Sequence, residues 1–323
     1  MKKNLILGLV TLGAASMLCG FDSAETAESL QQKMQEASSS QTSVDMNMAM
    51  NLDAAVNMSD GTTDSSIGIK MDGNFDVACL LEPFGMMMDG SMNLSTFGTS
   101  QALTMKMYGV TNDAGELETY VYTEDSSTGE AGTWAYENAG AFDMNEILEA
   151  SKSMEAVDLS DWGITFTLAP EAADVDGKEC YLLSTVMDSN TLSTVIDKTS
   201  ELSGQDLAAD DDVAQMLSLL TGLKINVAYY IDTTSYQLVK MHMDMNDSDL
   251  AVLNELIQAS MPTDGETTTT AEIVLNDFSI DAVVSSEEVA PITVPQEALD
   301  AVASGAAVSA EDVVDGVEDV IEE

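Results

Sequence analysis

A strict alternation of apolar and polar side chains constrains the fold of this chain more than any other feature. Every second residue from 44 to 58 is apolar: Val44, Met46, Met48, Met50, Leu52, Ala54, Val56 and Met58. Asp and Asn fill most of the positions between them. Successive side chains of a strand point to opposite faces, so this run predicts one long strand with an apolar face and a hydrated face.

The same alternation continues in the next segment. Apolar residues and one glycine recur there at Ile67, Ile69, Met71, Gly73, Phe75, Val77 and Cys79. The intervening SDGTTDSS sequence is rich in turn-forming residues, so the two strands should form an extended hairpin. Shorter runs of the same kind follow at about 91–97, 102–111, 117–124 and 132–137. The first half of the chain is therefore expected to be an antiparallel meander.

Beyond residue 142 helical patterns alternate with strands. Apolar residues at helical spacing predict helices at 143–157, 190–202, 210–222 and 248–260, in addition to a short helix at 24–37. Strands are predicted at 162–168, 180–186, 224–232, 236–246 and 270–281. The order of these elements predicts a single α+β domain over residues 44–303, built on a long antiparallel sheet.

The N-terminus has the layout of a secretory signal. Lys2 and Lys3 precede an apolar run from Leu5 to Leu18, which Cys19 ends. The run is shorter than the roughly 20 apolar residues of a membrane-spanning helix. Because Cys19 resembles the lipidated first residue of a bacterial lipoprotein, we expect a signal peptide over 1–19. The protein would then be anchored through Cys19 on the outer face of the cytoplasmic membrane, at the cell surface. Ordinary cleavage near Ala15 is the alternative.

The charge balance excludes several classes of partner. Asp and Glu total 57 against 10 basic residues, all of them Lys, and the net charge is -47. Nucleic-acid binding needs cations that displace counterions, so it is excluded, and the lack of Arg disfavours phosphate recognition. Residues 20–43 contain the short helix and a Ser-rich linker, and residues 304–323 form an acidic tail with seven acidic residues and no Lys.

Several segments together resemble the LolA-like superfamily of exported lipoproteins, which includes proteins similar to LppX and LprG. The resemblance is carried by the layout of residues 24–79, by DVDGKECYLLSTV at 174–186, by YYIDTTSYQLVKMHMDM at 229–245 and by PITVPQEALDA at 291–301. Within this superfamily the chain looks most like uncharacterised lipoproteins from Gram-positive cell surfaces.

The resemblance implies a strongly curved antiparallel sheet, an incomplete β-barrel, with helices packed on its concave face. A cavity between sheet and helices would hold a lipid or another apolar molecule. The superfamily is not enzymatic, so we expect no catalytic residue and no cofactor, and we expect a monomer. The candidate ligand-lining residues are Met46, Met48, Met50, Ile69, Met71, Met241 and Met243. The alternative is a surface module with a solid core that binds a protein and no small ligand.

The methionine pattern leaves a second interpretation open. Met recurs at every second position at 46–50, 105–107 and 241–245, and thioethers on one strand face could bind Cu(I). Flexible, polarisable Met side chains are equally suited to an apolar core or a pocket for variable ligands. Leu52, Val56 and Val239 continue the same rows, and a copper site would not need them, so lining of a core or pocket is favoured.

Other candidate sites are weak. His242 lies on the face of Lys240 and Asp244 and is expected to be exposed, and no zinc spacing or nucleophile motif accompanies it. The acidic runs at 174–179 and 210–212 lack the ligand spacing of a calcium loop and are better explained as a hairpin turn and a helix start. Cys79 and Cys180 are either a disulfide or two free thiols.

Overall fold

The structure is a computed structural model, and it describes residues 26–38, 41–59, 62–129, 131–141, 159–203, 222–260, 270–285 and 287–309. The expected signal peptide with Cys19 lies outside these residues. So do the predicted helix at 143–157, all but the last residue of that at 210–222, and residues 310–323 of the acidic tail. No helix among the described residues is long and apolar enough to cross a membrane.

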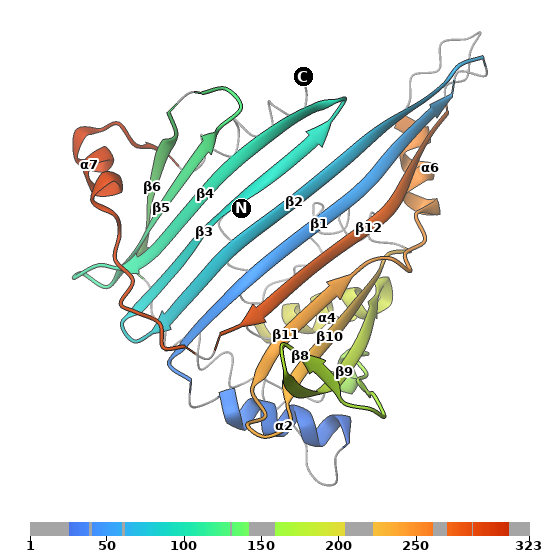
Figure 1. The fold of residues 1–323 in the computed structure, drawn as a ribbon, viewed down its shortest axis with the longest axis horizontal. Coiled ribbons are helices and arrows are strands. Elements are labelled where there is room, and N and C mark those ends of the chain that lie inside the picture. Colours follow the sequence, from blue (N-terminus) through green and yellow to red (C-terminus); the bar gives the residue numbers. More distant parts are fainter. Residues whose placement is uncertain are drawn as a thin grey trace. The chain divides into compact units, whose positions relative to one another are not determined.

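Within the described residues, one mainly antiparallel sheet of 13 strands dominates the fold (Figure 1). Its first six strands are β1 (Ser43–Ser59), β2 (Asp64–Leu81), β3 (Phe84–Thr96), β4 (Thr99–Thr111), β5 (Glu116–Asp125) and β6 (Thr133–Ala141). The others are β7 (Thr167–Leu168), β8 (Ala173–Val175), β9 (Lys178–Asp188), β10 (Lys224–Asp232), β11 (Leu238–Asp244), β12 (Thr270–Val284) and β13 (Val308–Ser309).

The strand order confirms the predicted fold class. It runs β13-β6-β5-β4-β3-β2-β1-β12-β11-β10-β9-β7, and β8 pairs with β9. Strands β1 to β6 are sequential neighbours, as expected of a meander. The pairing of β13 with β6 is parallel. Among the described residues the order is open, with β13 and β7 at its ends. The protein is therefore an α+β protein built on a long antiparallel sheet.

In the part of the chain that the structure describes, three predicted helices are present and one helix was not predicted. They are α2 (Ala27–Ser38), α4 (Ser189–Ser203) and α6 (Ala251–Ser260). Asp188 caps α4, because its carboxylate accepts a hydrogen bond from the Thr191 amide at 2.9 Å. The missed helix is α7 (Gln296–Ser304), which begins after Pro295 and ends at Gly305, whose φ of 70° is left-handed.

The predicted strand from Trp162 to Leu168 is mostly wrong. A 3-10 helix, η1, covers Leu159–Trp162, and only Thr167–Leu168 pairs with β9. Trp162 is buried. The short alternating run was therefore wrongly interpreted as a strand. Its first residue, Trp162, belongs to the 3-10 helix and is buried from there.

The chain forms two compact units that share strands β1 and β2. The first comprises residues 1–40, 51–70 and 150–281, and the second comprises residues 41–50, 71–149 and 282–323. The prediction of one domain over 44–303 stays a prediction, and each unit is described below by itself.

In the first unit, the most deeply buried side chains include residues of α2 and of β9 to β11. Leu30 of α2 and Leu183 and Ile231 of the sheet have no exposed surface. Ile231 lies opposite Leu238 at a bulge in the β10–β11 pair. A further cluster joins Val175, Cys180 and Val239.

In the second unit, an aromatic cluster forms the core. It consists of Tyr108 on β4, Tyr120 on β5, Trp134 on β6 and Ala298 of α7, all of them buried. Tyr108 pairs directly with Tyr120, and Tyr120 with Tyr136. Ile292, Val294, Ala301 and Val302 from the C-terminal segment pack against the cluster. Thus α7 covers one face of β4 to β6.

Candidate ligand-binding faces of the sheet

Side-chain bonds between strands identify the polar face of the sheet in the first unit. Asp53 on β1 accepts a hydrogen bond from Lys70 on β2 at 2.6 Å and another from Asn276 on β12 at 3.0 Å. Asn51 bonds to Asp277 on the same face. The bonds to Lys70 and Asn276 lower the pKa of Asp53 below its ordinary value. This face is therefore held together by charge-assisted and amide hydrogen bonds.

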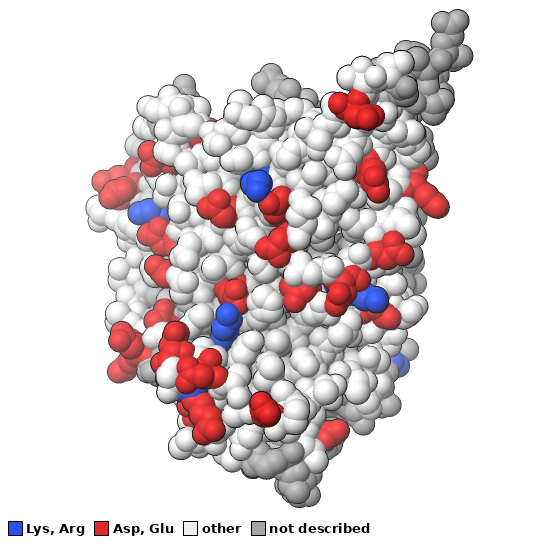
Figure 2. Space-filling model, turned by 45° about the vertical axis from the view of Figure 1, so that its right-hand side comes forward, with Lys and Arg blue, Asp and Glu red and all other residues white. Residues whose placement is uncertain are grey.

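The second unit has a polar face of the same kind. Asn47 on β1 donates to Asn74 at 2.8 Å and to Asp76 at 2.9 Å, both on β2. Asn93 on β3 donates to Asp72 at 2.8 Å. Further along, Lys106 on β4 pairs with Asp89 of β3 at 3.5 Å. Figure 2 shows acidic side chains scattered over one side of the molecule, with lysines beside some of them.

Because side chains alternate along each strand, these bonds also assign the opposite face. In the second unit it carries four candidate lining residues, Met46, Met48, Met50 and Met71, each of them half-buried. In the first unit it carries Ile69, Met241 and Met243, also half-buried. The seven candidates thus divide between the two units, and whether they line a binding site stays a prediction.

The second unit adds methionines on β3 that the sequence analysis did not single out. Met88 on β3 lies directly opposite Met107 on β4, and Met86 and Met92 lie on the same face of β3. All of these side chains are half-buried. Three consecutive methionines, 86–88, conceal the alternation in the sequence. Only the pairing with β4 reveals that Met87 points to the aromatic cluster and its two neighbours point away from it.

Phe75 interrupts the methionine rows on β2. Its ring lies beside Gly73 of its own strand and Gly90 of β3, and a side chain at Gly90 would collide with this ring and with the Asn74 carbonyl oxygen. Glycine at 90 therefore allows a large aromatic side chain to lie flat across two strands, and Phe75 is buried.

Met241 and Met243 face the interior of the first unit. Their partners on β10 are Tyr229 and Val227, which are both buried. Tyr229 also contacts Phe166, with 6.0 Å between the ring centroids. The two methionines therefore border an aromatic and aliphatic core and remain partly accessible at its edge.

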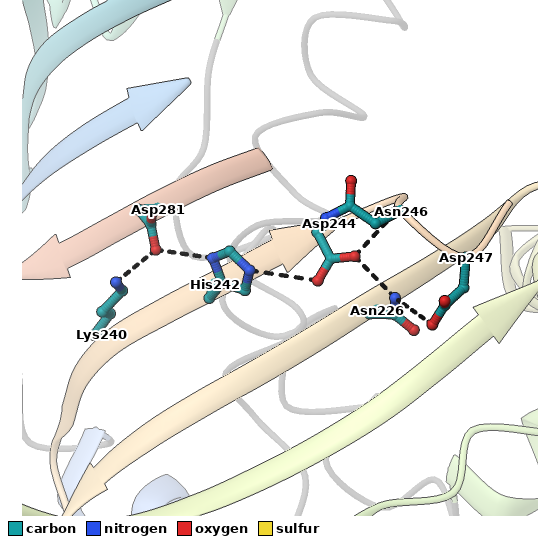
Figure 3. A network of polar contacts seen from close by, with 7 residues as sticks. All are labelled: Asn226, Lys240, His242, Asp244, Asn246, Asp247 and Asp281. Atoms are coloured by element: carbon teal, nitrogen blue, oxygen red, sulfur yellow. Dashed lines mark hydrogen bonds and ion pairs between the residues drawn. The ribbon is translucent and has the colours of Figure 1, made fainter. Parts of the chain in front are cut away.

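His242 is not fully exposed, contrary to the expectation from the sequence. Its side chain is 32% exposed and lies between two carboxylates (Figure 3): Nδ1 is 2.9 Å from Asp281, and Nε2 is 3.4 Å from Asp244. Lys240 also pairs with Asp281 at 2.7 Å, and Asn226 donates to Asp244 at 2.9 Å. The alternation correctly placed these side chains on one face, but it could not reveal Asp281, which comes from β12.

This polar network links strands β10, β11 and β12 on the face opposite Met241 and Met243. Burial opposes ionisation of Asp281, but the bonds from Lys240 and His242 outweigh it and lower the pKa of this carboxyl. Asp244 behaves similarly, with Asn226 as the main stabilising partner, so its pKa is lowered too. The network thus stabilises the pairing of three strands in the ionised state.

A hollow of about 410 Å³ lies in the first unit, where β1 ends and β2 begins. Most of the residues that line it are polar: Asn57, Met58, Ser59, Asp64, Ser65, Ser66, Thr270, Ala271 and Glu272. None of the seven candidate lining residues belongs to it. Its volume exceeds the roughly 300 Å³ of a small ligand pocket, and Met58 and Ala271 are the apolar residues of its lining.

The other candidate chemistries have the following outcome. Cys79 and Cys180 are free thiols, so the disulfide alternative is wrong. Asp176 and Gly177 form the turn of the hairpin between β8 and β9, which confirms the predicted hairpin, and the Asp174 carboxylate accepts a bond from the Gly177 amide. In the part of the chain that the structure describes, no group of three or more His, Cys, Asp and Glu could hold a metal ion.

Comparison with known proteins finds solved structures that are similar to this one, but no match by sequence. No family model matches the sequence, and no curated protein matches it. The structure is similar to the lipoprotein LppX of Mycobacterium tuberculosis, with a TM-score of 0.33 and 16% identity over 82% of this chain and 96% of that chain. LprF from Mycobacterium bovis has a TM-score of 0.33 and 15% identity over 83% and 97% of the two chains.

A third similar structure is a putative outer membrane lipoprotein-sorting protein domain from Vibrio parahaemolyticus. Its TM-score is 0.21, with 9% identity over 84% of this chain and 96% of that chain. With TM-scores this low, the similarity establishes neither a common ligand nor a common activity.

Proposed function

We propose that this protein is an exported, lipid-anchored binding protein without enzymatic activity, and that its methionine-rich sheet faces hold a lipid or another apolar molecule. One observation carries the proposal. In each unit, methionines and aliphatic residues occupy the sheet face opposite a hydrogen-bonded polar face, and they are half-buried.

The chemistry of the methionine rows supports this ligand class. An unbranched thioether side chain adapts to ligands of different shape without leaving a polar group unsatisfied. The facing pair Met88 and Met107 and their neighbours extend such a surface along two long strands. Carboxylates that bond across the sheet, such as Asp53 and Asp72, lie on the other face. An acyl chain on the methionine face would therefore avoid the charges.

The N-terminal sequence supports the cellular location. Lys2, Lys3, the apolar run and Cys19 have the order of a lipoprotein signal, and attachment of acyl chains at Cys19 would anchor the protein to the outer face of a bacterial membrane. LppX, a lipoprotein, is among the similar structures.

Two double variants test the proposed ligand site. M88Q/M107Q replaces a facing pair on the methionine face of the second unit, and M241Q/M243Q replaces two methionines on one face of β11 in the first unit. The control S91Q/T104Q replaces a facing pair on the polar face of the same two strands, β3 and β4. Binding is measured by titration with a fluorescent long-chain fatty acid.

We expect at least one methionine variant to bind the fatty acid about ten-fold more weakly, because each 1.4 kcal/mol of lost contact lowers affinity ten-fold. The control should bind as the parent does. Native mass spectrometry of the protein purified from its own host should show a co-purifying apolar molecule. Absence of both the bound molecule and the fatty-acid binding would instead favour the surface module that binds a protein partner.

A further inference from the structure

The turn between β3 and β4 presents an aromatic side chain to solvent. Phe97 is 75% exposed, more than Val186 at 52%, Leu299 at 39% or Val308 at 37%, the other large exposed apolar residues of the described chain. The turn lies at the end of two long strands (Figure 1). A single exposed apolar side chain is common on protein surfaces, so it is the position of this ring, at the apex of a long hairpin, that makes it available to a partner.

The backbone of this turn makes phenylalanine an unexpected residue. Thr96 and Thr99 are the last pair of the hairpin, and the two residues between them have φ values of 51° at Phe97 and 78° at Gly98. A two-residue turn with both φ angles positive strongly prefers Asn, Asp or Gly at its first position. A bulky side chain is strained there, and local strain of this kind is concentrated at functional positions.

Hydrogen bonds hold the turn in this conformation. The Ser95 and Ser100 hydroxyl oxygens are 2.7 Å apart, and the Thr99 hydroxyl donates to the Thr96 carbonyl at 2.8 Å. These bonds and the strand pairing below them fix the direction of the apex. Phe97 is thus presented by an ordered hairpin with hydroxyl groups close to the ring.

The end of the hairpin is also uncharged in a strongly acidic chain. Residues 90–105 contain no Asp, Glu, Lys or His, although the whole chain has a net charge of -47. Carboxylates of the neighbouring strands reach the lower part of this segment, since Asp72 accepts a bond from Asn93 at 2.8 Å and Asp125 accepts one from Gln101 at 3.3 Å, so the uncharged end is residues 94–100. An anionic membrane surface repels acidic patches over about a Debye length, and the end of this hairpin has none of its own.

We propose that the end of the β3–β4 hairpin, with Phe97 at its apex, docks on a lipid bilayer. The phenylalanine ring would enter the interfacial region, where aromatic side chains are favoured, and the hydroxyls of Ser95, Thr96, Thr99 and Ser100 would meet the polar headgroups. One ring provides weak, reversible contact, so the hairpin orients the protein on the membrane and does not anchor it. This docking does not depend on a bound ligand and goes beyond the function proposed above.

Tryptophan fluorescence of the full chain tests the docking. In F97W a new indole replaces the ring at the apex, while Trp134 and Trp162 are buried and provide a constant background. The protein is added to phosphatidylcholine vesicles with and without brominated acyl chains, which quench indoles that enter the bilayer. The control V186W places an indole at the next most exposed apolar position, on β9.

We expect the emission of F97W to shift to the blue on plain vesicles and to lose intensity on brominated ones, with neither change in V186W. Equal quenching of the two variants, or none in F97W, would overturn the proposal. A second measurement avoids the substituted ring: hydrogen–deuterium exchange of residues 95–100 should slow on vesicles in the parent but not in F97N, in which Asn suits the turn. Protection of F97N equal to that of the parent would also contradict docking by Phe97.

Discussion

The two faces of the β3–β4 hairpin in the second unit differ in how they are packed. On one face Tyr108 joins Tyr120 and Trp134 beneath α7, and all three aromatic side chains are buried. On the other face Met88 and Met107 lie opposite each other and remain half-buried. The aromatic part of the first face is a closed core and the rest of that face is polar, whereas the second face has the composition of an adaptable apolar surface.

The polar atoms of the aromatic cluster explain part of this difference. The Tyr120 hydroxyl donates to Glu118 at 2.9 Å, and the Tyr122 hydroxyl donates to Glu124 at 2.8 Å. These bonds give each ring a preferred orientation. The aromatic rings also pack at defined angles: the rings of Tyr122 and Trp134 are tilted by 48° to each other, with 5.1 Å between their centroids. Methionine has no such directional group, so its rows can adjust to different partners.

The largest expected effect is a difference between the two faces in how much a truncated side chain lowers the free energy of unfolding. W134A should lower the free energy of unfolding by about 3–5 kcal/mol, because it opens a cavity under α7. M88A, which truncates a half-buried side chain, should cost clearly less. Urea unfolding monitored by far-UV circular dichroism measures both. Equal losses would mean that the methionine face is packed as tightly as the aromatic one.

Alkaline pH should act mainly on the aromatic face. Burial and the Glu118 carboxylate raise the pKa of Tyr120 far above its ordinary value. A folded-state pKa above the unfolded one stabilises the fold fully below the unfolded pKa of about 10 and loses that contribution as pH rises further. Unfolding should therefore become easier above pH 10, and Y120F should reduce this dependence. Tyrosinate absorbance during the titration gives the measurement, and an ordinary titration of all tyrosines would contradict it.

A smaller effect is expected at the turn that joins strands β3 and β4. F97N should raise the free energy of unfolding by about 1 kcal/mol, because Asn tolerates the left-handed conformation better than Phe does. Thermal unfolding of F97N and the parent compares them. A loss of stability in F97N would show that the ring makes stabilising contacts within the protein.

The smallest effect concerns the polar face of the first unit. K240A removes the partner of Asp281 and should cost less than about 1 kcal/mol, as is usual for partly exposed ion pairs. Because the pKa of Asp281 is lowered in the folded state, its contribution exists above the unfolded pKa and is lost as pH falls through the folded pKa. The parent should thus lose more stability in acid than K240A does, measured by urea unfolding between pH 7 and pH 3. Parallel acid profiles would contradict the ion pair's contribution.

Much of the fold could be predicted because long strands repeat one simple pattern. The alternation over 44–58 and 67–79 gave β1 and β2 and their apolar faces, and helical spacing gave α2, α4 and α6. Shorter runs were less reliable: Trp162 packs from a 3-10 helix, and the three methionines at 86–88 carry no alternation of their own.

The sequence alone determined that strands with one apolar and one polar face dominate this protein, because the alternation of side chains follows from backbone geometry. It also determined the acidic composition and the N-terminal signal pattern. Only the tertiary structure decided which parts of each face are covered. Ala298 of α7 meets Tyr108, and Asp281 meets His242, through contacts between segments far apart in the chain. Local periodicity carries no information about such partners, so the closed aromatic core and the bridged histidine came from the structure.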